Sequence, residues 1–217
     1  PATAPPSAPP PTLRDTGLFS DLPSLTPRAG LHPYSINAPF WSDHALKQRW
    51  VAMPPQRPPR LRPDGQFEFP EGALWVKHFE LELIEGDPAS RRRLETRVLV
   101  RSHDGVYGLT YRWGDSHTNA QLVPDEGLDE TFQVQTAAGV RTQVWHYPGR
   151  AECLRCHTEV GGLALAFSPE QLNRTLDHDG LPTPQLERLR AAGLVPPDLP
   201  PPADLPALVH PRDASQP

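Results

Sequence analysis

The middle of the chain is a series of short segments in which hydrophobic and polar residues alternate, separated by turn-forming residues. Such alternation is typical of β-strands, because successive side chains of a strand point to opposite faces of a sheet. The segments are "ALWVKHFELELIE" (73–85), "LETRVLVR" (94–101), "VYGLTYRW" (106–113), "TFQVQT" (131–136) and "VRTQVWHY" (140–147). The turn sequences "HDG" at 103–105 and "AAG" at 137–139 predict hairpins. Together these features predict an antiparallel β-sandwich or a barrel-like sheet.

Capping signals predict helices on either side of the strands, over residues 42–50, 168–177 and 183–193. Ser42 is an N-cap residue for the first helix. Ser168 is the cap of the second, with Pro169 in the first helical position and Gln171 placed to complete a capping box. Gly193 ends the third helix as a C′ residue. The expected fold class is therefore mainly β with flanking short helices.

Proline is concentrated at the two ends of the chain. Of 30 prolines, six fall in residues 1–12 and eight in residues 195–217. Proline lacks a backbone donor and favours extended, semi-rigid chain. We expect a Pro-rich tether over 1–12, a single β-rich domain over 13–194 and a Pro-rich C-terminal tail over 195–217. The tail is either disordered or lies along the surface of the domain.

The charge balance is mildly acidic, with 21 basic and 26 acidic residues and a net charge of −5. This gives no electrostatic support to a nucleic-acid partner. No run of eighteen apolar residues is present, so no transmembrane segment is expected. The chain begins at Pro1 without Met or an apolar signal. We interpret it as a mature or trimmed form whose export signal lies outside the sequence, with a possible membrane tether at the N-terminus.

Both cysteines lie in "AECLRCHTEV" (151–160), three positions apart, and His157 follows the second. Three interpretations are open. A structural zinc site needs about four Cys or His ligands, usually in two pairs, and only one pair is present. A redox dithiol of the thioredoxin kind expects the C-x-x-C pair within a βαβ unit, whereas this pair follows an antiparallel region.

The third interpretation is C-x-x-C-H, the motif of covalent haem attachment in c-type cytochromes. Cysteines at positions i and i+3 lie on one side of a helical turn, from which both sulfurs can form thioethers with one edge of the porphyrin. The next residue then turns its imidazole toward the iron. The sequence therefore predicts one covalent haem c held by Cys153 and Cys156, with His157 as the proximal iron ligand.

The nature of the second axial position decides between an electron carrier and a haem enzyme. Met53, the only methionine, is one tentative distal ligand, because a thioether raises the reduction potential. His78, which shares a strand face with Leu74 and Val76, is the other. Each has a structural alternative, a filled gap in the core for Met53 and a hydrogen-bonded core histidine for His78. His146 or an open, water-bound position are further alternatives.

Charged residues near the predicted strands also have two interpretations. Lys47, Arg49 or Arg97 could neutralise the haem propionates through charge-assisted hydrogen bonds. Alternatively, Glu95 could pair with Arg97, or Asp43 with Arg49, to fix the sheet.

The chain also resembles a poorly characterised family of secreted bacterial monohaem c-type cytochrome domain proteins. Members carry a single C-x-x-C-H behind a β-rich region, often near or fused to sugar-dehydrogenase-like or other cytochrome c domains. In this sequence Met53 stands where the family pattern has Leu, and His44 where it has a small residue. The matching stretches are "YSINAPFWSDHALKQRW" (34–50), "FPEGALWVKHFEL" (69–81), "RRLETRVLVR" (92–101), "YGLTYRW" (107–113), "QVWHYPGRAECLRCH" (143–157) and "QLNR" (171–174).

These observations predict an exported, periplasmic monohaem cytochrome that passes single electrons between redox proteins, such as a dehydrogenase and another cytochrome. We expect a carrier rather than a catalyst. The alternative is a haem enzyme, or a binder of gas or peroxide, with an open distal position. A further alternative is a recognition module in which Trp75, Trp113 and Trp145 line a sugar site, although core packing also explains these residues.

Overall fold

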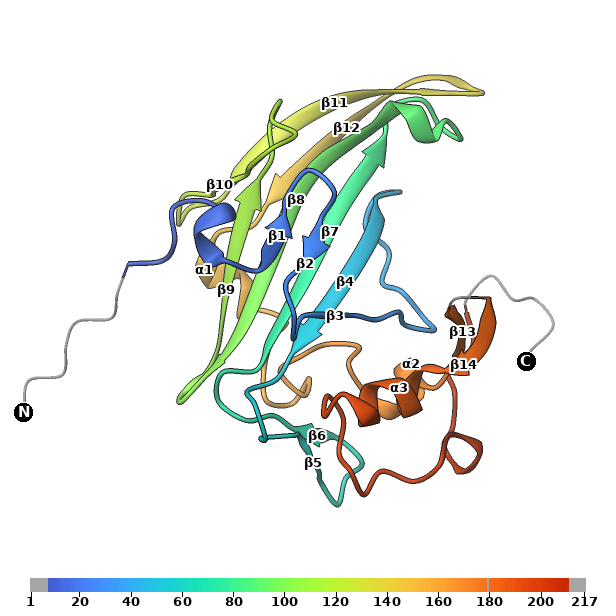
Figure 1. Ribbon diagram of the computed structural model, residues 1–217. Coiled ribbons are helices and arrows are strands. Elements are labelled where there is room, and N and C mark those ends of the chain that lie inside the picture. The colour runs from blue at the N-terminus through green and yellow to red at the C-terminus, as the bar shows by residue number, and fades with distance from the viewer. Residues whose placement is uncertain (1–7, 179, 211–217) are drawn as a thin grey trace, which may run out of the picture.

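The computed structural model describes residues 8–178 and 180–210, and its centre is an open, six-stranded antiparallel sheet (Figure 1). The strand order is β10–β9–β8–β7–β4–β3. The bounds are β3 His32–Pro33, β4 Leu46–Ala52, β7 Leu74–Glu82, β8 Arg91–Ser102, β9 Gly105–Arg112 and β10 Gln121–Leu122.

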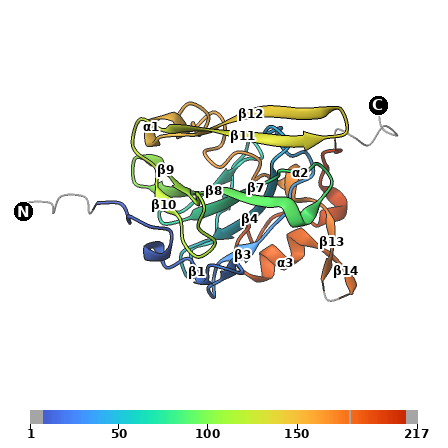
Figure 2. The same cartoon turned by 90° about the horizontal axis from the view of Figure 1, so that it is seen from above.

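A separate two-stranded hairpin, β11 (Leu128–Thr136) and β12 (Gly139–Tyr147), crosses over one face of this sheet (Figure 2). All five strands expected from the alternating pattern are therefore confirmed. The turn at 103–105 joins β8 to β9, and Gly105 has a positive φ of 138° that favours glycine. The barrel-like alternative is wrong, because the sheet does not close and the short strands β10 and β3 remain its two edges.

The helix predicted over residues 42–50 is also wrong, because this segment turns and then forms strand β4. Asp43 and His44 both have positive φ angles, which an α-helix does not tolerate. The backbone N–H of Ala45 donates to the carbonyl of Ser42 and closes the turn. The strand pairs with β7 over seven residues. Tertiary pairing thus overrides the weak helical propensity of the segment.

The other two predicted helices are present but shorter. The helix expected over 168–177 is one turn, α2 (Pro169–Leu172), with Ser168 at the N-cap position and Pro169 first, as predicted. The predicted capping box is absent, since the Ser168 hydroxyl bonds the Glu170 carboxylate instead. Strands β13 (Thr175–His178) and β14 (Leu181–Pro184) then form a small hairpin. The last helix, α3 (Gln185–Ala191), ends before Gly193, whose φ is +71°.

One face of the central sheet is covered by the N-terminal part of the chain. This segment includes a 3₁₀ turn, η1 (Arg14–Thr16), and a hairpin of β1 (Phe19–Asp21) and β2 (Thr26–Pro27). Its apolar side chains pack on those of the sheet to form one hydrophobic cluster. The cluster comprises Leu13, Phe19, Leu22, Leu25, Leu31, Trp50, Val76, Val98, Leu109, Tyr111, Trp113 and Ala120.

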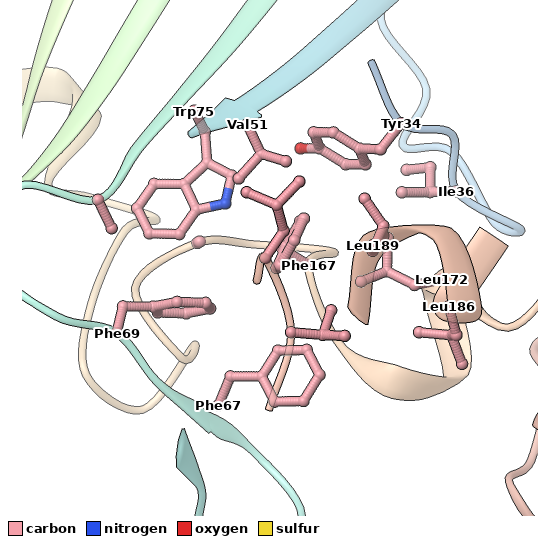
Figure 3. Packing of buried hydrophobic residues seen from close by; sticks show 14 of the residues in the cluster. Tyr34, Ile36, Val51, Phe67, Phe69, Trp75, Phe167, Leu172, Leu186 and Leu189 are labelled. Carbon is pink, nitrogen blue, oxygen red and sulfur yellow. The ribbon is translucent and has the colours of Figure 1, made fainter. Parts of the chain in front are cut away.

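The opposite face, which we call the cleft face, is covered by two different clusters at its two ends. At one end Trp75 and Val51 pack against Phe67, Phe69, Phe167 and the leucines of α2 and α3 (Figure 3). At the other end Phe79 and Leu81 pack beneath the β11–β12 hairpin. A strip of sheet remains between these clusters, and the candidate site lies over it.

Small elements complete the chain. They are β5 (Arg60–Leu61), β6 (Phe67–Glu68), η2 (Pro88–Ser90), α1 (Arg150–Cys153) and η3 (Pro202–Asp204). In the part of the chain that the structure describes, no helix combines the length and hydropathy needed to cross a bilayer.

Parts of the Pro-rich ends contact the domain. The Tyr111 hydroxyl donates to the carbonyl of Pro10, and Leu122 N–H donates to the carbonyl of Pro11. In the C-terminal tail, Val195 and Leu199 are buried in the cluster around Phe167. The first residues of the tail are therefore part of the packed core. Residues 1–7 and 211–217 lie outside the described residues.

Candidate functional site

A cleft opens on the strip between the two clusters of the cleft face. It holds about 950 Å³ of space not occupied by atoms, part of which is open to solvent. Its floor is formed by side chains of the central strands, among them Arg49, Trp75, Lys77, Arg97 and Leu99. Its opposite wall contains all three residues of the sequence motif, Cys153, Cys156 and His157. The structure therefore brings the predicted attachment residues together in one concave site.

The motif is positioned by a short helix, α1, that starts immediately after β12. The Glu152 carboxylate accepts hydrogen bonds from Gly149 N–H at 2.9 Å and from His146 Nε2 at 2.8 Å, which ties the helix to the strand before it. Only glycine fits at 149, because a Cβ there would lie 2.0 Å from the carbonyl oxygen of Asp125. The first cysteine is thus carried on an anchored turn.

Cys153 is pressed against the sheet at Gly108 of β9. A Cβ added to Gly108 would lie 2.4 Å from the Cys153 sulfur and 2.8 Å from its Cβ. Glycine at 108 therefore makes room for the sulfur. Cys156 is exposed at the cleft wall, and both thiols are free.

The environment of Cys153 also bears on the dithiol interpretation. Burial raises the pKa of the Cys153 thiol above its usual value. A redox-active dithiol requires a lowered thiol pKa. The Cys153 thiol therefore lacks the lowered pKa that is typical of redox-active dithiols.

His157 is held in the orientation of a metal ligand by the loop that follows it. Its Nδ1–H donates to the backbone carbonyl of Leu163 at 2.7 Å, which fixes the tautomer and leaves Nε2 unprotonated. Nε2 makes no hydrogen bond to any residue in 8–178 or 180–210. Burial lowers the pKa of His157, with further lowering by the charges of Lys77 and Arg97. A neutral imidazole with a free Nε2 is the form that binds iron.

The loop itself is strongly curved. Leu163 and Ala166 have positive φ angles of 62° and 64°. Phe167, 2% exposed, anchors the end of the loop in the cluster around Trp75 (Figure 3). The curvature returns the Leu163 carbonyl to the imidazole six residues earlier in the chain.

The floor of the cleft carries three cations at directly paired positions. Arg49 on β4 pairs with Lys77 on β7, and Lys77 pairs with Arg97 on β8. Directly paired residues of an antiparallel sheet point to the same face, so the three form a row, which we call the cationic row. Glu95 is the one anion bonded to the row, through Arg97 at 2.6 Å. Of the two predicted ion pairs, the structure contains Glu95–Arg97, whereas no hydrogen bond or ion pair joins Asp43 to Arg49 among the described side chains.

Neither tentative distal ligand lines the cleft. His78 alternates with Lys77 along β7 and therefore lies on the other face of the sheet, where its Nδ1 bonds the Thr96 hydroxyl at 2.8 Å. Met53 follows the end of β4 and packs against the cluster around Trp75. His78 is thus a hydrogen-bonded core histidine, and Met53 fills space beside the core, as the structural alternatives predict.

The remaining candidate residues are accounted for by packing and surface contacts. Trp75, Trp113 and Trp145 are 5%, 2% and 4% exposed, so they do not form an exposed sugar-binding face. His146 lies outside the cleft lining, and its Nδ1 bonds Asp129 at 2.6 Å. His44 stacks edge-on against Trp41.

Sequence reasoning missed Lys77 and Gly108. The alternation of β7 places Lys77 on the same face as the apolar residues Trp75 and Phe79. A single lysine among apolar residues on one strand face could have indicated a binding site. Gly108 is an isolated glycine inside a strand, which often marks a close approach of another part of the chain.

The residues present fit a haem c. The wall supplies two thiols and one neutral imidazole, the floor supplies apolar surface and cations, and Arg49 Nη2 and Arg97 Nε are buried donors without hydrogen-bond partners in the described chain. Within residues 8–178 and 180–210, no three His, Cys, Asp or Glu side chains are grouped to hold a metal ion by themselves. In comparisons with known proteins, no family model, no curated protein and no solved structure matches this chain.

Proposed function

We propose that the protein is an exported monohaem c-type cytochrome that carries single electrons between redox proteins. Haem iron supplies this chemistry by changing between its ferrous and ferric states. The observation that carries the proposal is the convergence of Cys153, Cys156 and His157 on one cleft, with His157 Nδ1 bonded to Leu163 and Nε2 left free.

The dimensions of the sheet support this assignment. Cys153 contacts β9 at Gly108, and Arg49 lies on β4 at the other side of the cleft. Three strand spacings of about 4.8 Å separate β9 from β4, which gives a span of about 14 Å. A porphyrin attached through Cys153 and lying over β8 and β7 would extend toward Arg49.

The chain's own residues would set the properties of the iron. Trp75, Leu99 and Ala164 give the inner part of the cleft a buried apolar lining, which would shield a bound haem from water. The Leu163 carbonyl holds the His157 ring in place and makes the imidazole more basic. The positive charge of the cationic row favours the ferrous state, because reduction removes one positive charge from the iron.

The cellular setting follows from the same chemistry. Bacterial haem attachment to C-x-x-C-H takes place outside the cytoplasm, so the proposal implies a periplasmic or otherwise exported protein. The open side of the cleft leaves an edge for a partner, either a dehydrogenase or another cytochrome. A tether over residues 1–12 would raise the effective concentration of the domain near that partner.

Absorption spectra of the purified protein in both oxidation states, combined with exposure to CO, test the carrier function. Reversible one-electron reduction, low-spin, six-coordinate iron in both states and no reaction with CO would support the carrier, and the sixth ligand would then be a residue other than Met53 or His78. High-spin iron that binds CO readily would contradict an electron carrier.

One observation favours a second candidate function. Since neither Met53 nor His78 lines the cleft, the position opposite His157 is a candidate binding site for a small ligand such as a gas. Saturable CO binding by the ferrous protein would support this function, and absence of CO binding would exclude it.

A further inference from the structure

We propose that the cationic row Arg49–Lys77–Arg97, together with Lys47, is the binding site for the two propionate carboxylates of the haem. This inference rests on the proposed function, because it assigns residues to the edge of the haem opposite the thioethers. The observation that carries it is a cluster of three cations on the cleft floor, with Lys47 beside them on the same sheet face, that has too few acceptors of its own.

The four cations come from three adjacent strands. Arg49, Lys77 and Arg97 occupy one paired row across β4, β7 and β8, and Lys47 lies two residues from Arg49 on the same face. Lys77 Nζ and the Arg97 guanidinium both lie over the Phe79 ring, at 4.9 Å and 4.8 Å from its centre. Lys47 and Lys77 are the only lysines in the sequence, and both belong to the cluster.

The cluster is unfavourable without an anion. Like charges at directly paired positions of a sheet repel each other, and burial removes the water that would screen them. Burial, followed by the charges of Arg49, Lys47 and Arg97, lowers the pKa of Lys77 to about 7. Burial, followed by the charges of Arg49 and Arg97, lowers the pKa of Lys47 to about 8. Such an arrangement persists in a fold when a ligand supplies the missing negative charge.

The contacts present in the chain leave donors unused. The buried carboxylate of Glu95 accepts from Arg97 and from Trp145 Nε1, so only one of the four cations has an anionic partner. Lys47 donates to the carbonyl of Phe40, which is neutral. Among the described residues, Lys77 has no hydrogen bond or ion pair, and Arg49 Nη2 and Arg97 Nε are buried without an acceptor.

The positions match the haem's own carboxylates. In haem c the thioethers are at one edge of the macrocycle and the propionates at another. Cys153 lies over β9, whereas the cluster extends from β8 to β4. Two carboxylates provide four acceptor oxygens and a charge of −2, and Arg and Lys side chains bind them by charge-assisted hydrogen bonds. A free oxyanion would offer the same chemistry, so the test must separate the two sources.

The test compares three variants of the haem-loaded protein by resonance Raman spectroscopy of the propionate bending modes. Lys77→Met removes a cation and donor from the cluster, and Lys77→Arg restores both. Arg28→Met is the matched control, because exposed Arg28 belongs to the segment that covers the other face of the sheet. We expect the propionate bands to shift in Lys77→Met and to keep their wild-type positions in Lys77→Arg and Arg28→Met.

Inorganic phosphate provides the second arm. If the propionates occupy the cluster, phosphate causes no saturable change in the spectrum of the haem-loaded protein. Wild-type propionate bands in haem-loaded Lys77→Met, or saturable phosphate binding that Lys77→Met abolishes, would overturn the inference. Absence of covalent haem from the wild-type protein would instead refute the proposed function, so the two failures are distinguishable.

Discussion

Gly108→Ala tests whether the cleft is built around the sulfur of Cys153. The added methyl group would lie 2.4 Å from Sγ and 2.8 Å from Cβ of Cys153. Non-bonded carbon contacts are optimal at about 3.5–4.0 Å, so α1 or β9 must shift by about 1 Å. Such overpacking costs about 1–3 kcal/mol. Replacing a strand glycine by alanine recovers about 0.5–1 kcal/mol of backbone entropy. We expect a net destabilisation of about 1–2 kcal/mol and incomplete thioether formation at Cys153.

The assay is urea unfolding of the variant in two backgrounds, with the mass of the denatured chain as a second readout. In a Cys153→Gly background the methyl group meets neither atom, so Gly108→Ala should be neutral or slightly stabilising. This double-mutant cycle isolates the contact from other effects of the substitution. An equal cost in both backgrounds, or a fully loaded variant of undiminished stability, would refute the reasoning.

Three further outcomes are expected. Met53→Leu and His78→Gln should leave the haem absorption spectrum unchanged, since neither side chain lines the cleft, and a change of spin state in either would contradict the structure. Glu95→Gln should lower the free energy of unfolding by about 1–2 kcal/mol in urea titrations, because the buried hydrogen bond from Arg97 is no longer charge-assisted on the acceptor side. An unchanged midpoint would contradict this. The hydrogen bond to Glu152 raises the pKa of His146 in the folded protein. The contact therefore stabilises the fold fully below the pKa of His146 in the unfolded chain, about 6.5. This stabilisation is lost as the pH rises through the higher pKa of His146 in the folded protein. His146→Gln should therefore destabilise the protein more at pH 6 than at pH 8, and an equal effect at both would count against the contact.

The sequence predicts correctly those strands whose alternating pattern matches the faces they bury in the folded protein. Strands β7, β8 and β9 alternate clearly and are joined by recognisable turns, so their hydrophobic faces can be assigned from the order of residues alone. Strand β4 has no such pattern, because Lys47 and Arg49 occupy the positions that face inward. Apolar residues are expected there, and only the cleft explains the cations.

The attachment motif could be predicted from spacing alone, but its surroundings could not. The contact between His157 and Leu163 lies in a loop where Leu163 has a positive φ angle, which no local signal specifies. The cationic row requires the register of three strands, and that register is set by the whole sheet. His78 is a second example. The pattern of β7 shows that His78 shares a face with Leu74 and Val76, but it does not show which face of the sheet carries the cleft.

Covalent attachment of one haem through Cys153 and Cys156 is the claim on which the account depends. The direct measurement is the intact mass of the protein, purified from a host that matures c-type cytochromes, after denaturation and extraction with acidified acetone, together with a count of alkylatable thiols. The account predicts a coloured chain heavier by one haem with no reactive thiol, and an uncoloured chain in a Cys153→Ala, Cys156→Ala control. A wild-type chain of unmodified mass with two reactive thiols would contradict it.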